Sequence, residues 1–372
     1  MRNLKYLVVP FLCKSSLLQL STYNREESYT KVYSNQKQYK IEPETIVFSG
    51  NSNTKLASEV AKCLGISLGK VLLERFADGE CNIQVLENVR GRNAFIIQST
   101  CPPVNENLIE LFLFISALRR ASVKTITVII PYYGYSRQDH KLAKTESIAA
   151  ADIAKILEQT GIDHLVSIDL HRGQLQGAFS TSVPVDNLSP YITLIYELNN
   201  HPLKLNPPNE LTLVSPDFNG VSRVKKVQDE LRVAFPNIKT KLAMIYKSKH
   251  PVSETEISLV GDVNGKNCLI VDDIIDSGRT LKNAADILKR EGAKQVMAYG
   301  THPVFSGKAA LNLGISNLSK IYVTDTIQIK ELDKQILHEK LSVLSVAPLL
   351  AETIYRLQKK ESLHELLGAH NL

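Results

Sequence analysis

Short apolar runs alternate along this chain with longer segments in which apolar residues recur at helical spacing. Ten runs rich in Val, Ile, Leu and Tyr predict strands: TIVFSG (45–50), AFIIQST (94–100), TITVIIPYY (125–133), HLVSIDL (164–170), LTLVSPD (211–217), KLAMIYK (241–247), NCLIVDDI (267–274), QVMAYGT (295–301), KIYVTDT (320–326) and LSVLSVAP (341–348). The helical segments include 55–65, 107–122, 147–161, 221–235 and 280–293. This order predicts an α/β fold with mostly parallel sheets covered by helices on both faces.

The number of strands indicates two tandem doubly wound sheets, with a boundary near NLSP at 187–190. We therefore expect an N-terminal extension at 1–42, an N-terminal α/β domain at 43–187 and a C-terminal α/β domain at 188–372. The last helix is able to pack back on the N-terminal domain. Ligands on such sheets bind beyond the carboxyl ends of the strands, so those ends are where functional residues are expected.

Charge and cysteine content exclude several functional classes. The net charge is +6, but residues 1–42 hold seven Lys/Arg against three Glu, which is +4 of that total. Because the rest of the chain is nearly neutral, no nucleic-acid partner is expected. The five cysteines include no CxxC pair, which favours reduced thiols over a disulfide framework or a zinc site.

The first 42 residues differ in character from the rest. They carry basic residues and several Ser/Thr, with no acid before Glu26, as organelle transit peptides do. A disordered tail is the alternative, and LKYLVVPFL (4–12) also resembles a short secretory apolar region. No apolar run is long enough to span a membrane. We expect a protein of the cytoplasm, or of a mitochondrion or plastid if the extension directs import.

Three acids stand where the strand NCLIVDDI ends, in the stretch DDIIDSGRT (272–280). A helix is predicted to start at Thr280, so its free N–H groups, with the hydroxyls of Ser277 and Thr280, form a site suited to a terminal phosphate. Asp272 and Asp273 are suited to accept hydrogen bonds from vicinal hydroxyls. An ordinary helix cap needs one acid and not three. The stretch therefore predicts a site for a phosphorylated sugar.

This stretch resembles the ribose-5-phosphate loop of the phosphoribosyltransferase fold, and other motifs narrow the resemblance. The chain is similar, from about residue 46 to its C-terminus, to the ribose-phosphate pyrophosphokinase family. The motifs that carry the resemblance include RFADGE (75–80), NVRG (88–91), PYYGYSRQD (131–139), DLH (169–171), SPD (215–217) and THPVFSG (301–307).

The resemblance implies transfer of the diphosphoryl group of ATP to the C1 hydroxyl of ribose 5-phosphate, with release of AMP. It assigns ribose 5-phosphate to Asp272, Asp273, Asp276, Ser277, Gly278, Arg279 and Thr280. It assigns ATP to Arg137 and Gln138, and to Phe76, Asp78 and Glu80 from a neighbouring subunit. The resemblance thus implies a homo-oligomer with its ATP site at a subunit interface.

Magnesium and catalytic cations are also implied by the resemblance. His171 and Asp217 would hold Mg²⁺ on the ATP phosphates, although the residues alone would favour an oxygen-only site. Lys247 and Lys249 would be the catalytic cations. They lie in YKSKHPVSETEI (246–257), a polar segment at the end of the strand KLAMIYK that is typical of a mobile loop able to close over the phosphates.

Some positions depart from the family pattern. Lys249 stands where Arg is usual, Ala151 where Lys is usual, Asn219 where the first Gly of a turn is usual, and Arg279 where Gly is usual. These changes leave the sugar and metal residues in place. Two other classes compete: a non-catalytic regulatory paralogue, and a phosphoribosyltransferase that consumes the product. The charged motifs count against the first, and the two α/β halves count against the second.

Overall fold

Two parallel sheets form the body of the molecule in a computed structural model, which describes residues 32–33, 38–141, 143–201, 203, 210–248 and 256–368. The first sheet has the order β1-β4-β5-β6-β7, and all its strands are parallel. Its strands are β1 (Thr45–Ser49), β4 (Asn93–Ile97), β5 (Thr125–Ile130), β6 (His164–Ile168) and β7 (Val185–Leu188).

The second sheet has the order β10-β9-β8-β11-β12-β13-β14, and only β10 is antiparallel to its neighbour. Its strands are β8 (Glu210–Ser215), β9 (Lys239–Ser248), β10 (Glu256–Val260), β11 (Asn267–Ile275), β12 (Gln295–Pro303), β13 (Lys320–Thr324) and β14 (Leu341–Leu344). A separate antiparallel hairpin is formed by β2 (Val71–Arg75) and β3 (Cys81–Val85).

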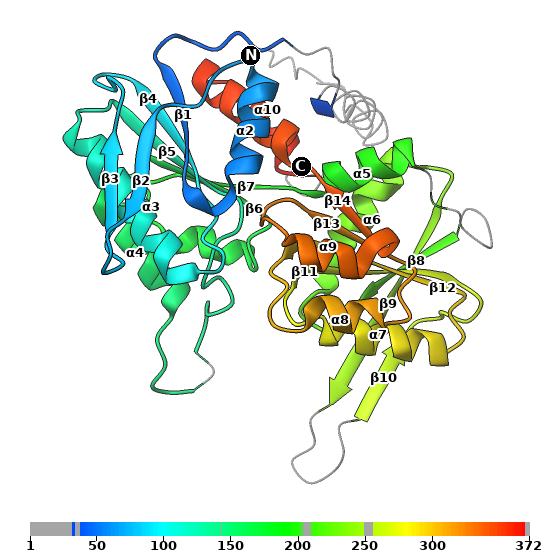
Figure 1. The fold of residues 1–372 in the computed structure, drawn as a ribbon. Coiled ribbons are helices and arrows are strands. Elements are labelled where there is room, and N and C mark those ends of the chain that lie inside the picture. The colour runs from blue at the N-terminus through cyan, green and yellow to red at the C-terminus, as the bar shows by residue number, and fades with distance from the viewer. Residues whose placement is uncertain are drawn as a thin grey trace, which may run out of the picture.

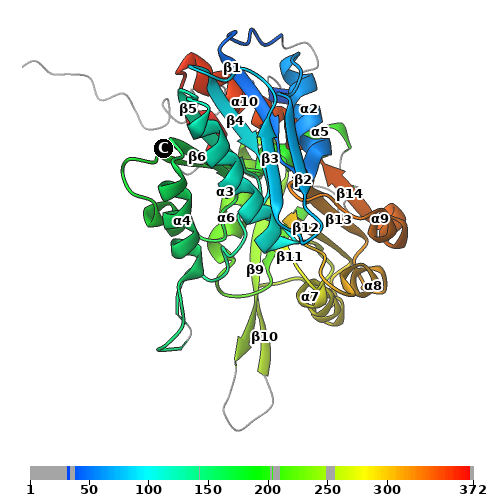
Figure 2. The same ribbon diagram turned by 60° about the vertical axis from the view of Figure 1, so that its left-hand side comes forward.

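Helices cover both faces of each sheet (Figures 1 and 2). They are α2 (Thr54–Leu64), α3 (Val104–Arg120), α4 (Ala149–Thr160), α5 (Tyr191–Asn200), α6 (Val221–Ala234), α7 (Arg279–Arg290), α8 (Ala309–Gly314), α9 (Glu331–Leu337) and α10 (Ala347–Lys359). No helix in the described ranges is long and apolar enough to cross a membrane. The α/β class and the ten predicted strands are confirmed.

Successive residues of a central strand pack into different hydrophobic cores, on opposite faces of the sheet. This explains why the sequences of the central strands are continuous apolar runs. In β11, Leu269 and Val271 belong to one cluster with α2, α5, α6 and α10, whereas Cys268 and Ile270 belong to another with α7 and α8. A strand buried on both faces has no solvent side on which to place polar residues. The apolar pattern therefore identified the strands but could not distinguish their two faces.

One hydrophobic core runs across both sheets. It joins strands of the first sheet to strands of the second through α2, α5, α6 and α10. The C-terminal helix α10 packs against α2, and Thr45 Oγ1 donates to Gln358 Oε1 at 3.0 Å. This core belongs to both sheets and is not divided between two domains. The domain boundary predicted at 187–188 therefore stays a prediction.

The sequence prediction missed the β2–β3 hairpin, β7 and β10, and it did not specify α5, α8 or α9. The hairpin strands are short and only partly buried, so they lack the continuous apolar runs of the central strands. Of the N-terminal extension, residues 1–31 and 34–37 lie outside the described ranges.

Candidate functional site

The sugar-phosphate loop connects β11 to α7, as the sequence predicts. Gly278 has φ +72°, and a Cβ at this position would come within 2.9 Å of Leu313 Cγ and 3.0 Å of the Ala309 carbonyl oxygen. Only glycine adopts this conformation without steric cost, and here α8 also leaves no space for a side chain. The α7 helix then begins at Arg279, with its first N–H groups available to an anion.

Hydrogen bonds from the turn between β12 and α8, and from α8 itself, hold this loop in place. The Ser306 N–H donates to the Asp276 carbonyl at 3.1 Å, and Asn312 Nδ2 donates to the Ser277 carbonyl at 2.8 Å. Arg279 and Thr280 are exposed, whereas Gly278 is buried. Contacts within the chain therefore support the shape of the loop.

Asp272 and Asp273 have different surroundings although they are adjacent. Asp273 is buried, and its Oδ2 lies 2.6 Å from His171 Nδ1 and 3.3 Å from an Arg223 nitrogen. Burial acts to raise the pKa of Asp273, but Arg223 and His171 hold it below the ordinary carboxyl value. Burial, then the charge of Asp273, raises the pKa of Asp272 well above its ordinary value.

An ion pair joins the sugar-phosphate loop to the segment after β5. Arg137 lies 2.7 Å from Asp276 Oδ2, and 139 positions separate the two residues in sequence. Gln138 follows directly and is exposed. The structure thus brings a residue assigned to ATP into contact with one assigned to ribose 5-phosphate.

His171 and Asp217 follow β6 and β8, at the carboxyl ends of strands in the two sheets. His171 is positioned by Asp273, and Asp217 Oδ1 accepts the Gly220 N–H at 2.9 Å. Nε2 of His171 and Oδ2 of Asp217 make no hydrogen bond with any described residue, so both atoms remain available as metal ligands. In the part of the chain that the structure covers, no group of three or more His, Cys, Asp or Glu forms a complete metal site.

Phe76, Asp78 and Glu80 lie in the turn of the β2–β3 hairpin. All three are exposed, Phe76 to 54%, and the Glu80 N–H donates to Asp78 Oδ1 at 3.0 Å. No hydrogen bond or ion pair among the described residues connects them to His171 or to the sugar-phosphate loop. Within one chain they are therefore not joined to the rest of the predicted site.

Lys247 belongs to β9, where it pairs with Ile257 of β10. The sequence predicted that the strand ends at Lys247 and that a mobile segment begins there, but β9 continues to Ser248 and pairs with β10. Lys249 lies outside the described residues. The roles of both lysines stay predictions.

Sequence reasoning assigned no role to Arg223, Asp169, Thr301 or His302. Arg223 on α6 contacts Asp169, Asp273 and the His171 carbonyl. Thr301 Oγ1 donates to Asp169 Oδ2 at 2.6 Å, and His302 Nε2 lies 3.3 Å from the Asp169 carbonyl. Asp169 and the Thr-His pair occur in the quoted motifs, but no local signal distinguishes Arg223 from an ordinary helix arginine.

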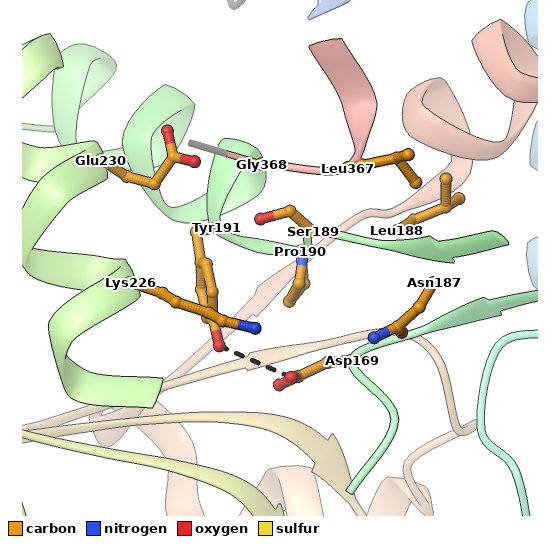
Figure 3. Close-up of a pocket in the computed structure, with 10 residues that line it drawn as sticks. All are labelled: Asp169, Asn187, Leu188, Ser189, Pro190, Tyr191, Lys226, Glu230, Leu367 and Gly368. Carbon is orange, nitrogen blue, oxygen red and sulfur yellow. Dashed lines mark hydrogen bonds between the residues drawn. The ribbon is translucent and has the colours of Figure 1, made fainter. Parts of the chain in front are cut away.

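A small polar pocket lies beside Asp169, between β7, α5, α6 and the last described residues (Figure 3). The Tyr191 hydroxyl approaches Asp169 Oδ1 at 3.5 Å within it, and Lys226 also lines it. None of the residues predicted to bind substrate or metal lines this pocket. It is therefore adjacent to the candidate site without forming part of it.

Comparison with known proteins agrees with this geometry. Residues 45–161 match the N-terminal domain of ribose phosphate pyrophosphokinase, and residues 225–368 match the phosphoribosyl synthetase-associated domain. A ribose-phosphate pyrophosphokinase of Ralstonia nicotianae is 44% identical over 325 residues, which cover 87% of this chain and 98% of the relative. One of Haemophilus influenzae is 42% identical over 328 residues, covering 88% of this chain and 100% of the relative.

A solved structure extends the similarity to three dimensions. The phosphoribosylpyrophosphate synthetase from Mycobacterium smegmatis superposes with a TM-score of 0.77 at 36% identity, covering 85% of this chain and 99% of that one. The similarity thus includes both sheets and nearly the full length of the relatives. On this evidence the chain belongs to the ribose-phosphate pyrophosphokinase family.

Proposed function

We propose that this chain transfers the diphosphoryl group of ATP to the C1 hydroxyl of ribose 5-phosphate, giving 5-phosphoribosyl 1-diphosphate and AMP. The observation that carries this proposal is the contact between two sets of strand ends: Arg137 reaches Asp276, and His171 reaches Asp273. A sugar-phosphate loop is thereby placed directly beside residues suited to a nucleotide's phosphates. Direct transfer between two bound substrates requires this proximity.

Ribose 5-phosphate binds at the β11–α7 loop in this proposal. The N–H groups at the start of α7, with the hydroxyls of Ser277 and Thr280, receive the 5-phosphate, and Arg279 adds a cation beside it. Asp276 and the acidic pair lie on the sugar side of the loop. Gly278 allows the backbone to approach the phosphate because it has no side chain.

ATP binds on the side of Arg137 and Gln138. The exposed hairpin turn that carries Phe76, Asp78 and Glu80 would contribute to the ATP site of a neighbouring subunit, which accounts for its separation from the other site residues. An aromatic ring and two acids suit an adenine and its amino group. This implies a homo-oligomer, and mixing inactive Phe76→Ala and Lys247→Ala subunits tests it: shared sites restore part of the activity, whereas sites within one chain do not.

Mg²⁺ would be held by two available ligand atoms, His171 Nε2 and Asp217 Oδ2. Mg²⁺ commonly keeps waters and binds one or two protein groups together with substrate phosphates, so an incomplete protein site is consistent with it. When bound, it would neutralise charge on the ATP phosphates. Lys247 and Lys249 would meet the charge that develops on the transferring group.

The decisive experiment incubates the purified chain with ATP, magnesium and ribose 5-phosphate and separates the products chromatographically. AMP and 5-phosphoribosyl 1-diphosphate should appear in equal amounts, and neither should form when ribose 5-phosphate is omitted. Formation of ADP alone would contradict the proposal. No nucleotide change, with or without inorganic phosphate, would favour the regulatory paralogue, which no present observation supports.

The N-terminal extension acts as a transit peptide in this proposal. The first family match begins at residue 45, so the preceding residues are outside the matched catalytic body. Their basic, hydroxyl-rich composition supports import into an organelle. N-terminal sequencing of the protein recovered from cells tests this, because an imported protein should have lost the extension and a cytoplasmic one should retain it.

A further inference from the structure

We propose that Asp273 and Arg223 are positioning residues that hold the imidazole of His171, and that Asp272 rather than Asp273 binds the sugar hydroxyls. This proposal rests on the proposed function. It changes the role of Asp273, which the sequence assigned to ribose 5-phosphate.

The first argument is the contact between Asp273 and His171. Asp273 Oδ2 lies 2.6 Å from His171 Nδ1, and the Asp273 side chain is only 4% exposed. With the Asp273 carboxyl oxygen as the acceptor, Nδ1 donates in this contact and Nε2 is left for a ligand. Carboxylates that bind histidine in this way orient the ring and fix its tautomer for a cation on the other nitrogen.

The second argument is that Arg223 holds both partners of this contact. One of its terminal nitrogens lies 3.3 Å from Asp273 Oδ2 and also donates to the His171 carbonyl at 3.2 Å. Its Nε lies 3.5 Å from Asp169 Oδ1, and its side chain is 11% exposed. The guanidinium therefore fixes the backbone after β6 and the carboxylate on β11 at the same time.

The third argument is the contrast with Asp272. It is only partly buried, and its Oδ1 accepts the N–H of Asp273 at 3.0 Å. It forms no ion pair with any residue that the structure describes, whereas Asp273 forms two. Of the two neighbouring acids, Asp272 is thus the one whose carboxyl group forms no ion pair among the described residues and is left for a ligand.

The test compares Asp273→Asn with Asp272→Asn, which make the same chemical change at adjacent positions. Nitrogen NMR of the substrate-free protein, with the His171 signals assigned from a His171→Gln variant, reports the tautomer of His171. Calorimetry measures the affinities for ribose 5-phosphate and for ATP with magnesium separately.

We expect Asp273→Asn to shift the His171 tautomer and to weaken ATP with magnesium by roughly 10- to 100-fold, as changes to such supporting residues do. Its affinity for ribose 5-phosphate should stay within about twofold of the parent. Asp272→Asn should give the reverse: binding of ribose 5-phosphate weaker by about tenfold, because hydrogen bonds between the sugar hydroxyls and the carboxyl group are lost, and an unchanged His171 tautomer. An unchanged tautomer in Asp273→Asn, or equal losses of ribose 5-phosphate in both variants, would overturn the proposal.

Arg223→Lys provides a second route if Asp273→Asn does not fold. It keeps the buried positive charge and removes the planar fork, so it should shift the His171 tautomer while leaving ribose 5-phosphate affinity unchanged. A parental tautomer in this variant would count against the role of Arg223. The tautomer is measured in the absence of substrates, so this test does not depend on the proposed function. If the parent protein bound neither substrate, the proposed function would be refuted, but the NMR measurement would still decide whether Asp273 and Arg223 position His171.

Discussion

The sugar-phosphate loop carries residues predicted to bind ribose 5-phosphate and the β9–β10 hairpin carries a residue predicted to act in catalysis, but the two regions are built in different ways. The turn after β12 and the helix α8 supply the hydrogen bonds to the carbonyls of Asp276 and Ser277 in this loop. The hairpin projects from the body in both overall views, and β10 is an edge strand (Figures 1 and 2). Tyr246 and Val260 on this hairpin are 45% and 55% exposed.

This difference indicates that the loop contributes to ground-state binding and the hairpin to the transfer step. A preformed loop contributes to substrate affinity because its geometry does not depend on the reaction. A cation on a projecting hairpin contributes most if it meets the phosphates only as charge develops on them. Substitutions in the two regions should therefore affect different kinetic parameters.

Lys247→Ala should have the largest effect, on kcat alone. Loss of one preorganised charge at a transition state typically lowers kcat by roughly 10²–10³-fold. Binding of both substrates, measured by calorimetry, should be nearly unchanged. Lys241→Ala is the control, because Lys241 lies exposed on the same strand and is paired with Thr212. If Lys247→Ala turned over at the parental rate, the cation would have to be sought at Arg137, Lys141 or Arg279.

Gly278→Ala should damage the loop and mainly weaken ribose 5-phosphate. The left-handed backbone and the contacts with α8 oppose a Cβ, which costs on the order of 1–3 kcal/mol. We expect a loss of affinity of roughly 5- to 100-fold, with ATP affinity less affected. Gly265→Ala is the matched control, since Gly265 has φ +67° but nothing within 4 Å of an added Cβ. If both variants bound ribose 5-phosphate equally well, the loop would not form the sugar site.

Asn312→Ala should weaken ribose 5-phosphate moderately. It removes the hydrogen bond to the Ser277 carbonyl, and such bonds contribute about 1 kcal/mol, or roughly fivefold in affinity. Asn317→Ala is the control, because Asn317 bonds to Asp286 at the surface instead. An unchanged dissociation constant would show that the loop keeps its shape without support from α8.

Lys249→Arg should have the smallest effect. The change keeps the positive charge and restores the fork that the family usually has, so steady-state kcat should be maintained or increased by a few-fold at most. A large loss of kcat would show that this chain requires the smaller ammonium group. That result would show that this chain differs from the family pattern in the cation that it requires at position 249.

The sequence determined the elements and the kind of chemistry at their ends. Apolar runs identified the central strands, because strands buried on both faces need continuous apolar sequence. The acids and hydroxyls of DDIIDSGRT (272–280) predicted a sugar-phosphate site, because one short segment contains the whole loop, and this role stays a prediction. The β2–β3 hairpin was missed because partial burial leaves a mixed pattern.

Only the tertiary structure decided how the strand ends meet. His171 and Asp273 are 102 positions apart and belong to different sheets, so their contact depends on how the two sheets pack. Arg223 on α6 contacts the His171 carbonyl after β6 and Asp273 on β11, although its sequence context resembles that of any amphipathic helix. Local patterns encode burial and turns within a segment, whereas the partner of a buried charge is set by packing between segments distant in sequence.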